Sequence, residues 1–284
     1  MTTLIIGGSG FLGTELTRQA TAAGHSTVAT YATAPGDPAQ AKWHLLDLEQ
    51  PGQLEQVLAD VQPTLVVNAA SSKASWTVTA QGPIRIAMAA AQHGIRLVHV
   101  SSDAVFSGDG RVHYDETCLP DPTLPYGAMK AAAEAGVLAV NPQAVVARTS
   151  LIIGRGQSVH ERAVHEMAAG TREGALFTDD IRCPVFVEDL AAALLELAAA
   201  EAAGIRHLAG ADAVSRHELG TLIAGRDGLD ASRLPAGLRA RTSLPGALDV
   251  RLDSRATQQE LRTKLRGVRE FCTAEVSGAE ADGA

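Results

Sequence analysis

A glycine-rich turn close to the N-terminus constrains this chain more than any other feature. Gly7, Gly10 and Gly13 are spaced by three between an apolar strand-like run, 2–6, and a helix-like run, 11–23. The first glycine permits a tight turn, the second lets backbone N–H groups approach a pyrophosphate, and the third lets the helix pack on the strand. The helix N-terminus also presents partial positive charge to phosphates. The turn predicts dinucleotide binding, with Phe11 and Leu12 beside these glycines at the cofactor.

The first half of the chain alternates strand-like and helix-like segments. We expect further strands at 26–31, 43–46, 64–68, 96–101 and 144–149, and helices at 54–60, 84–93 and 127–140. Several of these strands are continuously apolar, which is typical of a parallel sheet covered by helices on both faces. The pattern predicts an α/β Rossmann fold, a doubly wound parallel sheet with a smaller C-terminal substrate lobe.

After residue 150 the alternation becomes less regular. We expect helices at 158–169 and 189–200, a strand at 205–209, and a capping box formed by Ser215 and Glu218. Residues 225–250 are rich in Gly, Pro and Arg and predict loops. We therefore assign 1–150 to an NAD(P)-binding Rossmann domain that about 187–210 completes. Residues 151–186 and 211–272 form the substrate-binding lobe, and the small, acidic segment 273–284 is a disordered tail.

Composition excludes several classes of function. The net charge of −8 over 284 residues argues against nucleic-acid binding and against docking on an anionic membrane. No apolar run approaches the ~20 residues that span a bilayer. Cys118, Cys183 and Cys272 are far apart, which argues against a disulfide framework and favours the cytoplasm. The histidines lack metal-ligand spacing, so we expect no metal site. We expect the substrate to be a small molecule.

The end of the second strand bears on the choice of cofactor. It reads Ala29-Thr30-Tyr31-Ala32-Thr33, without the acid that would hold the ribose 2′-OH of NAD. No Arg stands there to attract a 2′-phosphate either, so NADP(H) is favoured and NAD(H) remains possible, with Thr30 at the cofactor. Asp47 and Leu48, after the third strand, are expected near the adenine, or Asp47 simply forms a turn.

Tyr126 and Lys130 carry the predicted chemistry. They are four residues apart and share one face of a helix. Hydride addition to a carbonyl leaves an alkoxide that needs a proton, and a Tyr hydroxyl can supply it if a nearby ammonium lowers its pKa. Lys130 can also hold the nicotinamide ribose, so both residues belong to the cofactor site. Ser102, at the carboxyl end of a strand, is expected to hold the carbonyl oxygen.

Two further charged residues are candidates for substrate binding. Asp103 follows Ser102 and orients a substrate or caps a turn. Arg182, in a segment expected to border the cleft, binds a phosphate or carboxylate of the substrate or is a solvated loop charge.

Several of these segments together resemble a known family. They are the glycine turn, Asn68-Ala69-Ala70 at the end of the fourth strand, the run Ser-Ser-Asp-Ala-Val-Phe-Ser-Gly at 101–108, and the Tyr126/Lys130 pair. The chain resembles extended short-chain dehydrogenase/reductases, and among them the dTDP-4-dehydrorhamnose reductase branch, to about residue 262. The resemblance implies an NAD(P)H-dependent reductase of the 4-keto group of a nucleotide-linked deoxysugar. It also implies that Asn68, Ala69 and Ala70 lie at the cofactor.

The chain departs from that branch at three positions. Ser102 replaces a Thr and keeps the hydroxyl, whereas Ala104 and Leu151 replace aromatic residues. The loss of two aromatic side chains leaves open an unusual sugar nucleotide or another polar ketone. A sugar-nucleotide epimerase and a non-catalytic NADP-binding regulatory subunit are the alternatives, and a homodimer is left open. Dehydration is disfavoured because Ala104 stands where a dehydratase carries its Glu.

Overall fold

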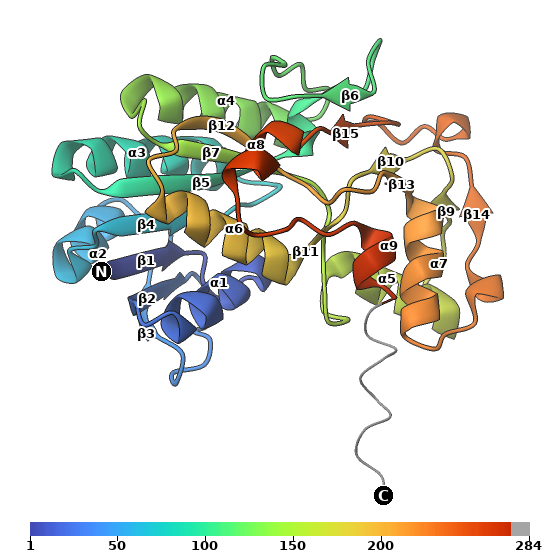
Figure 1. Ribbon diagram of the computed structural model, residues 1–284, viewed down its shortest axis with the longest axis horizontal. Helices are drawn as coiled ribbons and strands as arrows, with labels where there is room; N and C mark the ends of the chain where they lie inside the picture. The colour runs from blue at the N-terminus through green and yellow to red at the C-terminus, as the bar shows by residue number, and fades with distance from the viewer. Residues whose placement is uncertain (274–284) are drawn as a thin grey trace, which may run out of the picture.

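A computed structural model describes residues 1–273 and is built around a seven-stranded parallel sheet (Figure 1). The strand order is β12-β7-β5-β4-β1-β2-β3. In chain order the strands are β1 (Thr2–Ile6), β2 (Ser26–Tyr31), β3 (Lys42–Leu45), β4 (Leu65–Asn68), β5 (Arg96–Ser102), β7 (Val145–Thr149) and β12 (Gly204–Leu208). The direction of winding reverses between β1 and β4, which is where ligands of such sheets bind. The predicted Rossmann fold is confirmed.

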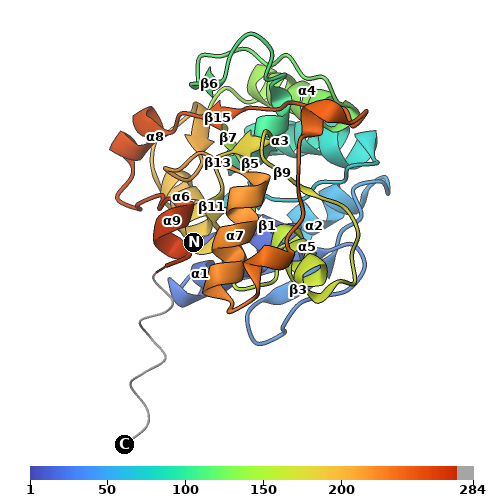
Figure 2. The ribbon, with the colours of Figure 1, turned by 90° about the vertical axis from the view of Figure 1, so that its right-hand side faces the viewer.

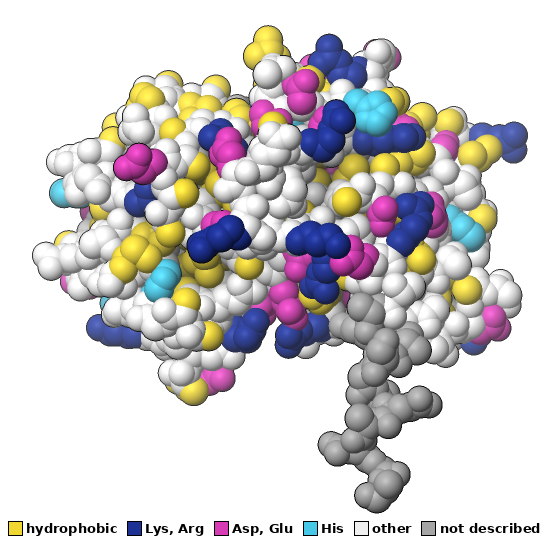
Figure 3. Space-filling model, in the orientation of Figure 1, with side chains coloured by type: hydrophobic (Ala, Val, Ile, Leu, Met, Phe, Trp, Pro, Cys, Tyr) yellow, Lys and Arg dark blue, Asp and Glu magenta, His cyan; other side chains and the backbone are white. Residues whose placement is uncertain are grey.

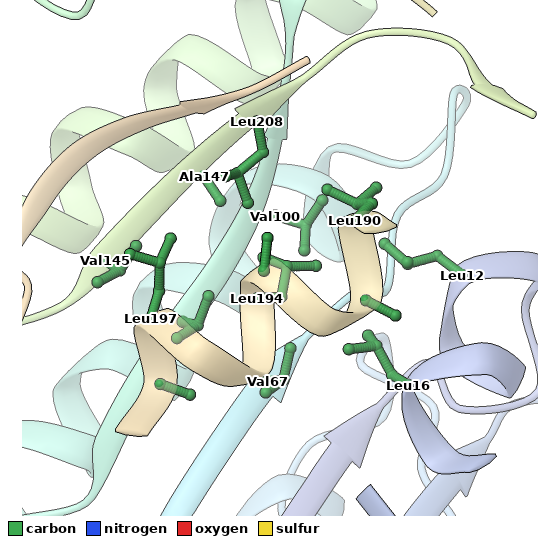
Figure 4. Close-up of a cluster of buried hydrophobic side chains, with 14 of the residues drawn as sticks. Leu12, Leu16, Val67, Val100, Val145, Ala147, Leu190, Leu194, Leu197 and Leu208 are labelled. Atoms are coloured by element: carbon green, nitrogen blue, oxygen red, sulfur yellow. The ribbon is translucent and has the colours of Figure 1, made fainter. Parts of the chain in front are cut away.

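Helices cover both faces of the sheet. One face carries α1 (Phe11–Ala22) and α6 (Val187–Ala199), and the other carries α2 (Gln53–Val61), α3 (Gly82–His93) and α4 (Pro125–Val140). Figure 4 shows the first of the two cores, in which Leu190, Leu194 and Leu197 of α6 point at the sheet. Burial on both faces explains why the strands are continuously apolar.

The remaining elements gather mostly at one end of the sheet, where α5, α7 and α9 pack together (Figures 1 and 2). The helices there and nearby are α5 (Val159–Ala169), α7 (Arg216–Arg226), α8 (Arg255–Glu260) and α9 (Val268–Phe271). Four two-stranded pairs join β6 (His113–Tyr114) to β15 (Arg251–Leu252), β8 (Ile152–Ile153) to β11 (Val185–Phe186), β9 (Leu176–Phe177) to β14 (Ala236–Gly237), and β10 (Ile181–Arg182) to β13 (Val214–Ser215). Single turns lie at Asp103–Val105, Ala231–Arg233 and Arg239–Arg241, and a π-helix lies at Thr77–Gln81.

Most predicted boundaries hold within two residues, and the differences have local causes. α4 begins at Pro125, two residues early, because a proline suits the first turn of a helix. Ser215 caps α7 as predicted by accepting a hydrogen bond from Glu218 N at 3.0 Å. A reciprocal capping box forms at Ser158 and Glu161, at the start of α5. Of the predicted tail, only residue 273 lies within the described residues.

Acidic and basic side chains are interspersed on the face shown in Figure 3. Many of them pair, such as Arg266 with Asp189 of α6 at 2.8 Å. Glu196 of α6 accepts hydrogen bonds from the backbone N–H groups of residues 262 and 263, which ties the C-terminal segment to that helix. Within residues 1–273 no helix is long and apolar enough to cross a membrane.

We predict that the packing of α6 on the sheet contributes strongly to stability. Leu194 is fully buried, so Leu194→Ala should lower the free energy of unfolding by about 3 kcal/mol, through lost burial and a cavity. Leu119→Ala is the matched control, because that side chain is 85% exposed and should change stability by less than about 0.5 kcal/mol. Urea denaturation measures both, and equal losses would contradict the proposed core.

Candidate active site

The glycine turn is a place of very close backbone packing. Gly7 has φ +80°, and a Cβ there would lie 2.7 Å from Ala70 N at the end of β4. A Cβ on Gly13 would lie 2.0 Å from Gly7 O, so only glycine lets α1 approach the turn this closely. Thr30 Oγ1 of β2 accepts a hydrogen bond from Gly7 N at 3.1 Å. The turn is therefore fixed by β1, β2, β4 and α1 together.

A cavity of about 350 Å³ lies against this turn. The predicted cofactor residues that line it are Gly7, Gly10, Phe11, Thr30, Asp47, Leu48, Ala69 and Ala70. Lining residues that the sequence did not single out are Ile6, Ser9, Ala32, Leu46, Ser71 and Val78. Leu12, Gly13 and Asn68 are buried and do not line this cavity, so their predicted contact with the cofactor stays a prediction.

Asp47 forms the turn considered for it and also lies at the cavity, while its contact with the adenine stays a prediction. Its carboxylate accepts a hydrogen bond from Glu49 N at 2.9 Å, which forms a turn, and the residue also lines the cavity. Gln53 Oε1 accepts a hydrogen bond from Asp47 N at 2.8 Å and fixes that turn against α2.

Asn68 is fully buried and acts inside the sheet. Its Oδ1 accepts a hydrogen bond from Ala70 N at 3.2 Å, so its amide nitrogen faces Nδ1 of His99 on β5, also at 3.2 Å. His99 Nδ1 is therefore the acceptor in this contact. Burial, with a contribution from the charge of Lys130, lowers the pKa of His99 well below its usual value. His99 is therefore neutral.

The N-terminus of α4 brings Tyr126 to the carboxyl end of β5. A Cβ on Gly127 would lie 2.0 Å from Ala104 O, so the helix packs on the single turn 103–105 as only glycine allows. The Tyr126 hydroxyl lies near the side chains of Ser71 and Ser102, which both act to lower its pKa. Ser102 Oγ also accepts a hydrogen bond from Ala104 N at 3.2 Å. The segment after β4, the end of β5 and the first turn of α4 thus meet at the Tyr126 hydroxyl.

Lys130 lies one helical turn further along α4. Its Nζ lies 6.0 Å from the centre of the Tyr126 ring and donates a hydrogen bond to Val100 O at 2.9 Å. Burial lowers the pKa of Lys130 to about 8, against the opposing effect of the Glu134 carboxylate. The predicted Ser102, Tyr126 and Lys130 therefore come together in space.

One electrostatic expectation is not met in the unliganded protein. Burial raises the pKa of Tyr126, with Asp103 adding to the rise and hydrogen bonds from Ser71 and Ser102 opposing it. The expected lowering by an ammonium is absent. A raised pKa keeps the phenol protonated at neutral pH, which is the form that donates a proton.

The two predicted substrate residues are both buried. Asp103 accepts a hydrogen bond from Ser150 Oγ at 2.7 Å and lies 3.7 Å from Arg182 Nε. Arg182 donates from Nη2 to Ala247 O at 2.8 Å and from Nη1 to Leu248 O at 3.1 Å. Arg182 thus holds the 247–248 loop in place and leaves few donors for a ligand.

A second basic residue, Arg216, lies close to Arg182, and the sequence analysis did not single it out. Arg216 Nε is 3.4 Å from Asp180 Oδ2, and Arg216 Nη1 is 3.4 Å from His160 Nδ1. Burial and the charges of Arg216 and Lys73 lower the pKa of His160 to about 3. No local spacing could have found this group, because residues 56 apart in the chain come together only in the folded lobe.

Ser71 is the other residue that the sequence analysis missed. It lines the cavity and also lies near the Tyr126 hydroxyl, so it links the two parts of the site. Its position just after the fourth strand was a usable signal, since ligands bind beyond the carboxyl ends of parallel strands. Among residues 1–273, no group of three or more His, Cys, Asp or Glu side chains is placed to hold a metal ion.

Comparison with known proteins fits this geometry. dTDP-4-dehydrorhamnose reductase of Mycobacterium tuberculosis is 34% identical over 245 residues, covering 81% of this chain and 77% of the relative. A solved structure titled hypothetical dTDP-4-dehydrorhamnose reductase from Sulfolobus tokodaii has a TM-score of 0.81 at 27% identity, over 94% of this chain and 97% of that one. The Bacillus anthracis enzyme in complex with NADP shares the fold, with a TM-score of 0.81 at 21% identity, over 95% of this chain and 96% of that one.

The doubly wound sheet and its glycine turn, with these relatives, define an oxidoreductase of the extended short-chain dehydrogenase/reductase type. More particularly, the chain belongs to the RmlD substrate binding domain family, which matches residues 1–274. The resemblance stated from the sequence is confirmed.

We predict that Gly13→Ala abolishes NADPH binding, because the added methyl group would force α1 away from the turn. Gly225→Ala is the matched control, since a Cβ on that glycine of α7 meets nothing within 4 Å. Fluorescence titration with NADPH measures both variants, with circular dichroism to confirm folding. Binding by folded Gly13→Ala at the affinity of the unchanged protein would contradict the assignment of the turn.

Proposed function

We propose that this protein reduces the keto group of a nucleotide-linked 4-keto-deoxysugar, or of a related polar ketone, with Tyr126 as the proton donor. The observation that carries the proposal is the grouping of Tyr126, Ser102 and Lys130 at the carboxyl edge of the sheet, where the Lys130 amine lies 6.0 Å from the centre of the Tyr126 ring. The names of the relatives supply the substrate class. The predicted epimerase and regulatory-subunit alternatives differ in that neither consumes the cofactor.

The proposed chemistry assigns one role to each residue. A nicotinamide cofactor held at the glycine turn would supply the hydride that reduces the carbonyl carbon. Ser102 donates a hydrogen bond to the carbonyl oxygen, and Tyr126 transfers its proton to that oxygen as negative charge develops. Lys130 is free to exchange its bond to Val100 O for the nicotinamide ribose and to stabilise the phenolate that remains.

NADP(H) is the favoured cofactor, with NAD(H) possible. Thr30 and Ala32 line the cavity at the end of β2, where a carboxylate would repel a 2′-phosphate. Neither residue carries charge, so selection against NAD(H) is weak. The NADP held by the Bacillus anthracis enzyme supports this order.

We propose that the lobe of residues 151–186 and 211–272 binds the rest of the substrate. Asp103 and Arg182 remain candidates for that role, and Arg216 and His160 join them. A homodimer and a cytoplasmic location also remain proposals. The exposed small apolar residues Ala135, Ala139 and Val140 of α4 would suit the contact between two copies, and light scattering of the purified protein tests it.

We predict that Tyr126→Phe lowers turnover by about 10²- to 10⁴-fold and leaves NADPH affinity unchanged, since only the proton donor is lost. The assay follows NADPH oxidation with dTDP-4-dehydrorhamnose and a panel of polar ketones. Tyr114→Phe is the matched control, because the Tyr114 hydroxyl accepts from Gly108 N and donates to Arg111 O, both at 3.0 Å, within the 108–114 loop, and turnover should persist. Full activity in Tyr126→Phe would refute this mechanism. Sugar inversion without NADPH oxidation would favour the epimerase.

We predict tighter binding of NADPH than of NADH, and a reversed order in Ala32→Asp, because the new carboxylate would repel the 2′-phosphate and accept the 2′-OH. Ala32→Asn is the control of equal size without charge and should keep the original order. Isothermal titration calorimetry measures all of these affinities. An unchanged order in Ala32→Asp would place the adenosine ribose elsewhere.

A further inference from the structure

The face of α4 that carries Tyr126 and Lys130 continues into the protein interior with a third ionisable residue. Glu134 follows Lys130 by four residues, so the three side chains form one row along the helix. Glu134 is only 3% exposed, and Lys130 is equally buried. A carboxylate is rarely buried this deeply unless it is paired, because desolvation disfavours the charge.

Glu134 is held by two neighbouring strands. Arg148 of β7 donates to it from Nη2 at 2.8 Å and from Nε at 3.1 Å. Ser101 of β5 donates its hydroxyl hydrogen to Glu134 Oε1. Ser101 and Arg148 are direct partners in the register of the two strands. A single carboxylate therefore ties α4 to both β5 and β7.

The same stretch of β5 also receives Lys130. Lys130 Nζ bonds Val100 O, Glu134 bonds the Ser101 hydroxyl, and the next residue is Ser102. Successive residues of one strand thus fix the Lys130 amine, the Glu134 carboxylate and the hydroxyl that faces Tyr126. A shift of Glu134 would therefore move α4 relative to Ser102.

Charged and titratable residues occur on α4 and on the elements packed against it. They are Tyr126 and Glu134 of α4 itself, Arg96 and His99 of β5, Arg148 of β7, Asp103 of the turn 103–105, and Arg85 and His93 of α3. The π-helix 77–81 contributes none. His99 is neutral, Asp103 acts on Tyr126, and the two α3 residues line a groove shared with α2. Glu134 is the carboxylate whose charge acts on Lys130.

We propose that Glu134 is a positioning residue that holds α4 against the carboxyl end of β5 and keeps the Lys130 amine charged. The catalytic meaning of this inference rests on the proposed function, in which Lys130 serves as an ammonium. Arg148 and Ser101 hold this carboxylate in place inside the protein.

The titration of Lys130 tests this inference without a substrate. The chain has four lysines, and Lys42, Lys73 and Lys264 are exposed, so carbon-13 labelling of the lysine side chains gives four resolvable signals. Loss of the Lys130 signal in Lys130→Arg assigns it. We expect the Lys130 midpoint near pH 8 in the unchanged protein and about one pH unit lower in Glu134→Gln, which leaves the Arg148 charge unpaired beside it.

Two further variants separate charge from packing. The double variant Glu134→Gln/Arg148→Gln removes both charges, so its Lys130 midpoint should lie between those of the unchanged protein and Glu134→Gln. It also keeps the inference testable if Glu134→Gln does not fold. Ser101→Ala removes one hydrogen bond of Glu134 but no charge and should leave the midpoint in place. An unchanged midpoint in both Glu134 variants, or an equal shift in Ser101→Ala, would overturn the inference.

The reduction assay supplies a second measure. Because the charged amine is lost as pH rises through its pKa, the alkaline fall of kcat should move to lower pH in Glu134→Gln by the shift of the lysine midpoint. If Tyr126→Phe keeps full turnover, the proposed function fails while the lysine titration still decides the role of Glu134. If Tyr126→Phe is inactive and the lysine midpoint does not move, only the inference about Glu134 fails.

Discussion

The closeness of α4 to the end of β5 is the constraint on which the site depends. A methyl group on Gly127 would fall 2.0 Å from Ala104 O, so the helix can dock here only because that position lacks a side chain. Tyr126 precedes this glycine and is thereby brought to Ser102. Gly13 likewise allows close packing at the other part of the site, where α1 meets the glycine turn. Two contacts between a helix and a loop thus set where cofactor and proton donor meet.

Burial determines the charge states within this arrangement. It raises the pKa of Tyr126 and lowers that of Lys130, so both groups resist ionisation before any ligand binds. A protonated phenol suits reduction, whereas the amine titrates close to physiological pH. The buried Glu134–Arg148 pair adds rigidity beneath them, and removal of one partner of such a pair typically costs roughly 3–5 kcal/mol.

The sequence predicted those parts of the fold that follow from local pattern. Continuous apolar runs predicted the strands, and the spacing of Gly7, Gly10 and Gly13 predicted the turn, because both patterns can be read within a short stretch of sequence. The bond between the Asn68 side chain and His99 was not predicted, because the direction in which a strand-end side chain faces depends on the sheet around it. Tyr126 and Lys130 were found because a helix fixes their spacing.

The rest depended on contacts far apart in the sequence. Arg182 was expected either to bind a ligand or to be a solvated loop charge. It is buried, and it donates to carbonyls about 65 residues further along the chain. Ser71 went unnoticed because its partner Tyr126 lies on a different element. His160 and Arg216 come from two helices of the C-terminal lobe, whose packing has no periodic signature.

A crystal structure of the complex with NADPH is the most direct test of the account. In that complex we expect the pyrophosphate on the glycine turn and the nicotinamide ribose on Lys130. We expect the Tyr126 hydroxyl within reach of a carbonyl placed over the reactive ring carbon. A nicotinamide ring bound away from Tyr126, with the hydroxyl facing another part of the protein, would contradict it.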